Sequence, residues 1–345
     1  MEFYAVSNQK RPKRLSEKTR EFARESQLGK YGDEAMKTPT VSLDHIADFD
    51  SLSPLKQYDI AIREIAEKAP VHLCQNELIS GAATLGAAIL HKVPATRNGK
   101  LLWQSVSHLT LGLDKVLQIG INGIEKEIDA HLEKNHVLES QLDFYESLKN
   151  TIQSFRLWHT RCLKTLEEQN SPNYAILKDV PFQTPKSFHE AVQSLWFTFA
   201  FTRLTGNWPG IGRIDKMLGG FLKSDLASKR ITLDEAREIL AHFFIKGCEW
   251  IRSAPPEGSG DAQHYQNIVL SGIDESGNDV TNEVTYLVLD IIEELNISDF
   301  PVSVRINRNT PDKLLKRISE VIKLGGGRPM DRCQYSRQKK VKKHI

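Results

Sequence analysis

Apolar residues recur every three or four positions along most of the chain between residues 109 and 324. This spacing predicts helices over 109–133 and 138–169, with the first continuing past Gly120 and Gly123. Residues 188–204 are apolar nearly all round, so we expect this helix to be buried. Further amphipathic helices are predicted over 54–68, 215–223, 233–252, 282–295 and 311–324.

Polar residues at expected helix starts support these assignments. Ser187 with Glu190, and Thr232 with Glu235, have the hydroxyl and carboxylate spacing of capping boxes. Thr310 is the predicted N-cap of the last helix.

Two β-branched runs, Asn267–Leu270 and Val302–Ile306, are predicted strands between these helices. Their order with helices 282–295 and 311–324 is strand, helix, strand, helix. This order is typical of a parallel sheet, with the two strands side by side and a right-handed crossover between them. The predicted fold class is therefore helix-rich α/β.

The rest of the chain has weaker patterns. Residues 1–50 are polar and lack a sustained period, which predicts an arm or a weakly packed lead-in. Val71–Leu73 and Glu77–Ser80 are consistent with a strand that enters a loop, and 82–104 is predicted to be mostly loop. No linker divides the chain, so we expect one domain.

Composition narrows the class of protein. The 345 residues are 40% hydrophobic and 26% charged, which is typical of a globular protein. We expect neither a transmembrane span nor a secretory signal, because no apolar run is long enough. The four cysteines lack a Cys-x-x-Cys pair, which argues against a disulfide framework or a zinc site and favours the cytoplasm.

The formal net charge of +2 hides an asymmetry between the ends and the body. Residues 1–30 hold eight Lys/Arg against four Glu, and residues 331–345 hold six Lys/Arg against one Asp. The body is therefore acidic, which argues against a nucleic-acid-binding face. A nucleic-acid binder that uses the basic end is kept only as a minor alternative, and solvated termini are favoured.

Local motifs give little chemistry by themselves. The Gly206–Gly212 stretch lacks the Lys-Ser/Thr of a phosphate loop, and a tight turn is favoured. Residues 274–279 have calcium-type oxygens at the wrong spacing, so a strand-to-helix turn is favoured. His131 and His136 are five apart and point to different helix faces, so no metal site is predicted.

A longer set of motifs carries a family resemblance between residues 181 and 329. They are Pro185-x-x-Phe188-x-Glu190-Ala191, Gly212-Arg213-Ile214-Asp215-x-x-Leu218, Ile231-Thr232-x-x-Glu235-Ala236, Gly272-Ile273-Asp274-x-x-Gly277-Asn278-Asp279 and Pro301-x-Ser303-Val304-Arg305-Ile306. Upstream motifs are Asn76-Glu77-Leu78-Ile79-x-Gly81 and Ser107-His108-x-Thr110. In number and order they resemble the N-terminal half of glycyl radical enzymes, the pyruvate formate-lyase family and its dehydratase-like members.

The resemblance implies the first half of an α/β barrel wrapped by helices. It also implies radical chemistry: a radical S-adenosylmethionine activase makes a glycyl radical, which oxidises a finger-loop cysteine to a thiyl. The thiyl then helps to break a C–C, C–O or C–N bond in a small metabolite, the work of a lyase or acyltransferase in anaerobic metabolism. Positioning of the substrate carries much of such catalysis.

The sequence departs from the family after Pro329, where MDRCQYSRQKKVKKHI has no apolar period. We therefore expect a partial family domain over 51–329 and a loosely attached, basic non-family tail over 330–345. The finger-loop cysteine and the glycine loop are missing, so the expectation is a truncated enzyme that binds no cofactor and is inactive alone. Its expected partners are a small-molecule substrate, an activase or a missing C-terminal half, and possible homo-oligomers. A non-catalytic binding or regulatory module and one half of a split enzyme remain alternatives.

The resemblance also selects candidate site residues. His108, with Ser107 and Thr110 as helpers, is expected to point into the barrel and bind a substrate hydroxyl or carboxylate, since imidazole donates hydrogen bonds near neutral pH. A helix-entry role for His108 stays equally open. Arg203 is the one charge near the end of an apolar helix, which indicates either recognition of an anion or a helix end that reaches solvent, and the second interpretation is slightly favoured.

Arg213 and Asp215 are expected to be structural anchors, a role favoured over the alternative of substrate binding. Asp215 lies in the first turn of a predicted helix, where a carboxylate suits the helix dipole. Arg213 is expected to bind a carboxylate or the backbone carbonyls that close the preceding turn.

Overall fold

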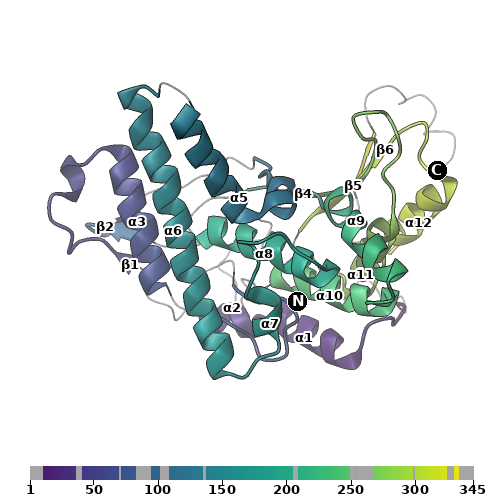
Figure 1. Cartoon of the computed structure of the whole chain (residues 1–345). Helices are drawn as coiled ribbons and strands as arrows, with labels where there is room; N and C mark the ends of the chain where they lie inside the picture. The colour runs from purple at the N-terminus through teal and green to yellow at the C-terminus, as the bar shows by residue number, and fades with distance from the viewer. Residues whose placement is uncertain are drawn as a thin grey trace.

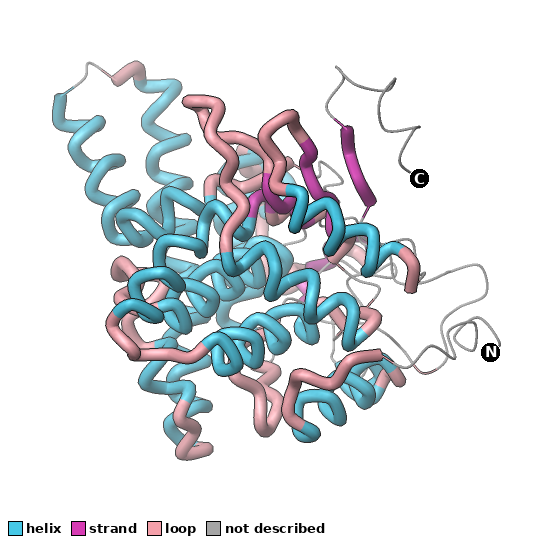
Figure 2. Tube along the Cα trace, turned by 90° about the vertical axis from the view of Figure 1, so that its right-hand side faces the viewer, coloured by secondary structure: helices cyan, strands magenta, loops and turns pink. Residues whose placement is uncertain are grey.

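The computed structural model describes residues 11–35, 41–69, 71–82, 95–101, 109–134, 137–204, 209–248, 253, 267–297, 300–324 and 330–333. These residues form a mainly helical body with a parallel sheet at one side (Figure 1). Figure 2 shows the strands of that sheet gathered beside the helices. The helix-rich α/β prediction is confirmed.

Three helices form one end of the body. α3 (Pro54–Lys68) and the long α6 (Glu139–Glu168) lie side by side, and α5 (Leu113–Lys134) packs against α6 (Figure 1). Their core includes aromatic rings stacked face to face. The ring centroids of Trp158 and Phe197 are 4.3 Å apart, as are those of Phe155 and Phe201. Such pairs add about 0.5–1.5 kcal/mol each to the free energy of burying the rings.

α5 differs from the prediction at two points. It begins at Leu113 and not at residue 109, because Thr110 instead forms a parallel bridge with Gly210. It is also kinked at Gly120, whose φ of 67° lies in the left-handed region that glycine tolerates. A Cβ at this position would lie 2.5 Å from the carbonyl oxygen of Phe182, so the close approach requires glycine.

The centre of the body contains α7 (Asn173–Leu177), α8 (Phe188–Leu204) and α10 (Leu233–Lys246). As predicted, α8 is buried on nearly all sides. The capping box of Thr232 and Glu235 is confirmed at the start of α10. At α8 the hydroxyl of Ser187 accepts the Glu190 N–H at 3.2 Å, whereas the Glu190 carboxylate binds the N–H of the residue before Ser187.

The parallel sheet has the order β4 (Gly212–Arg213), β5 (Ile268–Ser271), β6 (Val302–Ile306), β7 (Met330–Cys333). β5 and β6 pair in parallel from Ile268↔Val302 to Ser271↔Arg305, with α11 (Glu283–Leu295) between them in sequence. The predicted strand pair is confirmed. α9 (Ile214–Ala227) follows β4, and α12 (Asp312–Ile322) follows β6.

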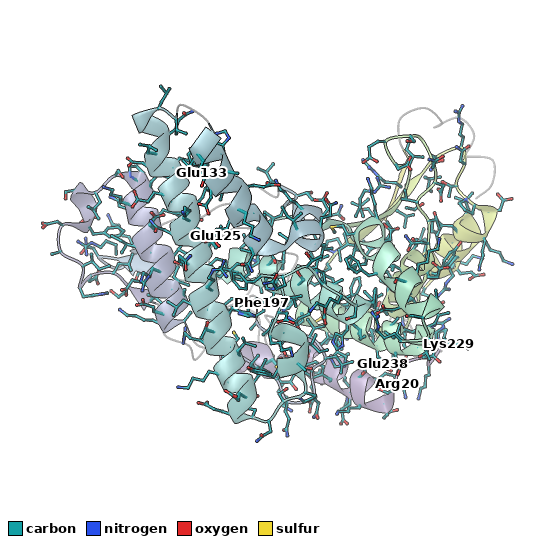
Figure 3. All side chains as sticks on the ribbon, in the orientation of Figure 1. Arg20, Glu125, Glu133, Phe197, Lys229 and Glu238 are labelled. Atoms are coloured by element: carbon teal, nitrogen blue, oxygen red, sulfur yellow. The ribbon has the colours of Figure 1, made fainter. Side chains whose placement is uncertain are left out.

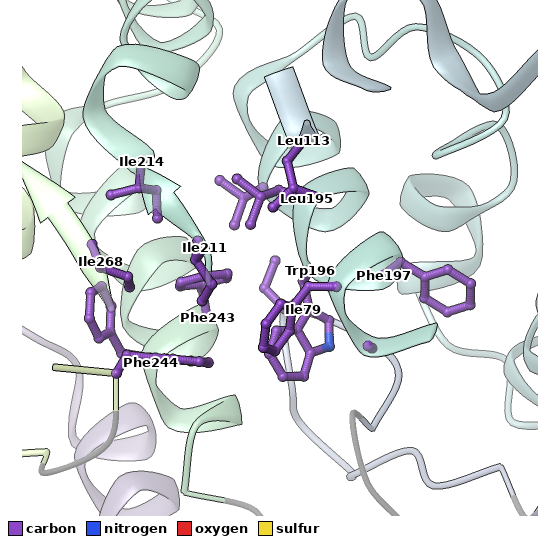
Figure 4. Close-up of a cluster of buried hydrophobic side chains, with 14 of the residues drawn as sticks. Ile79, Leu113, Leu195, Trp196, Phe197, Ile211, Ile214, Phe243, Phe244 and Ile268 are labelled. Atoms are coloured by element: carbon purple, nitrogen blue, oxygen red, sulfur yellow. The ribbon is translucent and has the colours of Figure 1, made fainter. Parts of the chain in front are cut away.

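The sheet has one covered face. Ile268 and Leu270 of β5 and Val302 and Val304 of β6 are exposed by at most 1%, and they pack into the common core. Figure 4 shows Ile268 beside Phe244 of α10 in this cluster. Burial of each large apolar side chain stabilises the fold by roughly 1.5–3 kcal/mol. This core holds the sheet against the helices.

β7 corrects the expected boundary of the basic tail. Met330–Cys333 pairs in parallel with β6, from Ser303↔Met330 to Ile306↔Cys333. The expectation of a loosely attached tail from residue 330 is therefore wrong for this strand, because pairing uses backbone groups that an apolar pattern does not reveal. The rest of the tail, 334–345, lies outside the described residues.

The N-terminal segment is also better packed than expected. Within the expected arm, α1 (Glu17–Gln27) and α2 (Lys30–Ala35) are helical, and Phe22 and Ala23 are buried against the body. Figure 3 places Arg20 of α1 near Glu238 of α10. The prediction of a weakly packed lead-in is wrong for these helices, because few but well-placed apolar residues suffice to dock α1.

A second, small sheet contains β1 (Val41–Ser42), β2 (Ala95–Arg97) and β3 (Lys100–Leu101), and a 3-10 turn, η2 (Phe49–Ser51), follows β1. It replaces part of the loop predicted over 82–104. Residues 71–80 contain no strand, which corrects the interpretation of Val71–Leu73 and Glu77–Ser80. In the described residues no helix is long and apolar enough to cross a membrane.

A group of charges ties the N-terminal segment to α11 and α12. Arg317 contacts Asp290 at 2.9 Å and Glu293 at 2.5 Å, Arg14 contacts Glu293 at 2.7 Å, and Arg237 contacts Asp290 at 3.3 Å. These five residues are called the α11 ion network below. Their side chains are 8–29% exposed, so water still reaches the network.

Candidate functional site

The predicted site residues are only partly within the described structure. Ser107 and His108 lie outside the described residues. Thr110 lies beside β4: it bridges Gly210, and its methyl carbon Cγ2 is 2.7 Å from where a Cβ on Gly212 would be. The segment that carries Thr110 thus pairs in parallel just before β4, which brings this predicted residue next to Gly212, the first residue of β4.

Arg203 is buried near the end of α8, with 4% of the residue exposed. The slightly favoured interpretation, a helix end that reaches solvent, is therefore wrong. The helix end packs inside the molecule because the apolar residues of α8 are surrounded by other elements. A buried guanidinium requires hydrogen-bonding partners, so Arg203 keeps its place as a candidate for anion recognition or for a structural role.

Arg213 closes the carboxyl end of the neighbouring strand. Its Nη1 donates to the carbonyl oxygen of Ile273 at 2.8 Å, and its Nη2 donates to that of Ser271 at 2.9 Å. The two bonds use the planar fork of the guanidinium on backbone carbonyls, the kind of contact expected of an anchor. Arg213 thereby ties β4 to the end of β5.

Asp215 is fully buried in the first turn of α9. Its Oδ2 accepts the Ser271 N–H at 2.6 Å and the Thr285 hydroxyl at 2.7 Å, and its Oδ1 accepts the Lys216 N–H at 2.8 Å. Burial raises the pKa of Asp215, and these hydrogen bonds oppose the rise. The carboxylate joins α9, the end of β5 and the start of α11.

The other face of the sheet is polar. Pairing places Arg213 beside Val269 and Val269 beside Ser303, and the alternation of β6 puts Arg305 on the same side as Ser303. Val269, Arg213 and Arg305 are all partly exposed, in contrast to the covered face. The Ser303 hydroxyl donates to the side-chain oxygen of Asn267 at 3.1 Å. We call Arg213, Asn267, Val269, Ser303 and Arg305 the polar face.

A second polar cluster holds residues Glu77–Gly81 in the core. The side-chain amide of Gln193 accepts the Ser80 N–H at 2.7 Å and donates to the Ser80 carbonyl at 3.0 Å. The Trp196 indole donates to the Gly81 carbonyl at 2.6 Å. The other side chains of this 77–81 clamp are Asn173, His189, His242 and Lys246. Sequence reasoning missed the clamp, although a lysine within the apolar run of α10 was a signal.

Lys246 and Glu77 form an ion pair within the clamp, with side chains only 1% and 2% exposed. Burial raises the pKa of Glu77, and Lys246 opposes the rise. His242 accepts the Leu78 N–H through Nδ1 at 3.2 Å and contacts Thr19 through Nε2 at 3.1 Å. Burial lowers the pKa of His242 to about 3, so its imidazole is neutral at pH 7.

The described residues contain no group of three metal-ligating side chains. Asp274 instead accepts the N–H groups of Ser276 and Asn278 at 2.9 and 2.8 Å, which makes 274–279 the strand-to-helix turn that was favoured. A pocket of about 240 Å³ opens between α3 and α6, beside Asp59 and Glu146, and none of the predicted site residues lines it.

A family model decides what this arrangement belongs to. The model described as pyruvate formate lyase-like matches residues 94–333, which include the parallel sheet and most of the helices. The chain belongs to the pyruvate formate lyase-like family. The match extends to residue 333, the end of β7, so family sequence does not stop at residue 329.

Curated members of the family are similar to part of the chain. It is 30% identical over 243 residues to isethionate sulfite-lyase of Nitratidesulfovibrio vulgaris, an alignment that covers 63% of this chain and 29% of that protein. It is 31% identical over 163 residues to trans-4-hydroxy-L-proline dehydratase of Clostridioides difficile, with 44% of this chain and 20% of that protein covered. These two relatives are named as a lyase and a dehydratase, and neither is named as an acyltransferase.

Solved structures share the fold. The B12-independent glycerol dehydratase from Clostridium butyricum superposes with a TM-score of 0.76 at 20% identity, over 94% of this chain and 52% of that one. A glycyl radical enzyme from Archaeoglobus fulgidus gives 0.69 at 22% identity, over 90% and 50%. The chain therefore spans about half the length of these solved relatives and less than a third of the curated relatives it matches.

Proposed function

We propose that this chain forms the N-terminal part of a glycyl radical lyase or dehydratase that acts on a small hydroxylated metabolite. The observation that carries the proposal is the family match over residues 94–333. The fold shared with the glycerol dehydratase supports the proposal, and so do the activities after which the relatives are named, a sulfite-lyase and a dehydratase among them. Cleavage of a carbon–heteroatom bond is the chemistry these names have in common.

In this proposal the chain supplies substrate positioning. The polar face of the sheet offers hydrogen-bond donors, and Thr110 lies at its β4 edge. By resemblance, His108 with Ser107 receives the substrate hydroxyl and passes its proton. A glycyl radical and a cysteine thiyl, with an activase to install the first, supply hydrogen abstraction. Arg213 and Asp215 hold the strand ends in place by the bonds described above.

The test is electron paramagnetic resonance under anaerobic conditions. The purified chain, incubated with a radical S-adenosylmethionine activase, S-adenosylmethionine and a reductant, is expected to give no glycyl radical doublet. Addition of a polypeptide that carries the finger-loop cysteine and the glycine loop of a family member is expected to restore the doublet and substrate consumption. His108→Gln in that mixture should leave the doublet unchanged and lower turnover by about 10²–10⁴-fold.

Two outcomes would contradict the proposal. A doublet from this chain alone would show that it carries its own radical glycine and is not the N-terminal part. A doublet in the mixture with no consumption of any hydroxylated substrate would instead favour a non-catalytic binding or regulatory role.

A further inference from the structure

Arg305 is the residue of the polar face that the fold leaves without an explanation. Within the described part of the chain its guanidinium makes no hydrogen bond and no ion pair, although the residue is only partly exposed. An arginine presents five N–H donors in a rigid fork. Loss of solvent around such a group without new partners costs free energy, so an unpaired arginine beside buried strands is a place for a ligand.

A second cation lies beside Arg305. Gly272 follows β5 directly, and both arginine side chains pass close to it. A Cβ on Gly272 would lie 2.9 Å from the Cβ and 3.1 Å from the Cδ of Arg305. It would lie 3.6 Å from the Nη2 of Arg213. The glycine thus gives the two arginine side chains room to approach the same point. Each Nη atom of Arg213 donates one hydrogen bond to a carbonyl oxygen, and its buried Nε has no hydrogen-bond partner in the described residues.

The nearby carboxylates are occupied elsewhere. Asp215 accepts hydrogen bonds from Ser271, Thr285 and Lys216, and in the described residues it accepts none from either arginine. Asp279 binds the Asn307 amide at 3.4 Å. In the described residues no carboxylate forms an ion pair with Arg213 or Arg305, although the buried Asp215 interacts with the charge of Arg213. The charge of Arg305 is thus left without a carboxylate partner among the described residues at this end of β6.

We propose that Arg305 binds the oxyanion, a carboxylate or sulfonate, of the substrate, with Arg213 adding charge. This inference rests on the proposed function and narrows it, since the substrate class becomes a small hydroxylated anion and not a neutral polyol. The guanidinium fork matches the two oxygens of such a group, so the bond is bidentate and charge-assisted.

The test is calorimetric titration of the chain, which needs no radical. The probes are isethionate, a hydroxylated sulfonate, and ethylene glycol, a neutral diol, at constant ionic strength. Arg305→Gln is expected to weaken isethionate binding at least tenfold, which is about 1.4 kcal/mol, and to leave ethylene glycol unchanged. Arg305→Lys should fall between, because it keeps the charge and loses the fork.

The matched control is Arg308→Gln. Arg308 is exposed, lies three positions further along the same segment and, in the described residues, also makes no bond. The affinity of the Arg308→Gln variant for isethionate should stay within twofold of that of the wild type. An equal loss in Arg308→Gln, or wild-type binding of isethionate no tighter than that of ethylene glycol, would overturn the inference. Either result leaves the radical experiment of the preceding section to judge the proposed function by itself.

Discussion

The 77–81 clamp and the α11 ion network use the same kinds of charged groups in opposite surroundings. Lys246 and Glu77 are almost completely withdrawn from water, whereas Arg317 is 14% exposed and Glu293 is 8% exposed in a network with several alternative partners. A buried pair has no solvent to replace a lost partner, while a network at the surface has both water and other charges. The number of ion pairs therefore says little about stability unless the solvent exposure of each pair is known.

The largest effect is expected from removal of one charge of the clamp. Lys246→Met should destabilise the protein by about 3–5 kcal/mol, because it leaves the Glu77 carboxylate buried without its counter-charge. The measurement is urea unfolding followed by circular dichroism. The control is the double variant Glu77→Gln/Lys246→Met, which should recover most of the loss. A single variant that costs less than about 1 kcal/mol would mean that the two groups do not form an ion pair.

The clamp should also respond to pH in its own window. The pKa of His242 is about 3 in the folded chain and about 6.5 in the unfolded one, so the unfolded state binds its proton first as the pH falls. The free energy of unfolding therefore falls as the pH decreases from 6.5 towards 3, and this histidine contributes about 1.4 kcal/mol of that fall per pH unit. Burial lowers the pKa of His159 and His189 as well, so they act in the same direction.

His242→Gln separates this contribution from the others. Urea midpoints of wild type and variant between pH 7 and pH 5 should show a smaller slope for the variant. The α11 ion network responds at lower pH. The hydrogen bond from Arg317 lowers the pKa of Glu293, so the stability that this carboxylate contributes is lost only below pH 4.5, the usual pKa of a glutamate. Parallel slopes for wild type and variant above pH 5 would contradict a neutral, buried His242.

The smallest effect is expected from the network. Arg317→Met should cost about 1–2 kcal/mol in low salt, because Asp290 and Glu293 keep Arg14 and Arg237 as partners and regain water. In 1 M NaCl the loss should fall to less than half, whereas the loss in Lys246→Met should barely change. Unfolding curves at both salt concentrations check this. Equal salt dependence in the two variants would remove the distinction between the regions.

The sequence predicted what depends on local periodicity. α6, α8 and the β5–β6 pair were predictable because apolar spacing and capping residues are properties of neighbouring positions. The sequence did not predict α1, because only Phe22 and a few other residues of this helix are buried, and so few do not make a periodic apolar pattern. The prediction that Thr310 caps α12 is wrong: its hydroxyl accepts the Asn307 N–H at 2.8 Å, and Pro311 occupies the cap position.

The site depends on contacts between distant parts of the chain. Arg213 and Asp215 were recognised from a motif, and the contacts of Arg213 with carbonyl oxygens are of the expected kind. The sequence did not predict that the Arg305 guanidinium has no partner among the described residues, since only strand register shows that it shares a face with Arg213. The roles of Ser107 and His108 stay predictions. Register, burial and pairing of charges are three-dimensional properties that a period of 2 or 3.6 does not encode.

The kink of α5 gives one further consequence. At Gly120 the helix in effect starts again, and a helix start has N–H groups with no partner inside the helix. The N–H groups of Ile121 and Asn122 donate to the carbonyl oxygens of Pro181 and Phe182, at 3.0 and 3.1 Å. A loop sixty residues away in sequence thus performs, with its backbone alone, the task that a serine or aspartate side chain performs at an ordinary N-terminus. The second half of α5 is therefore capped only once the chain beyond α6 has folded back onto it.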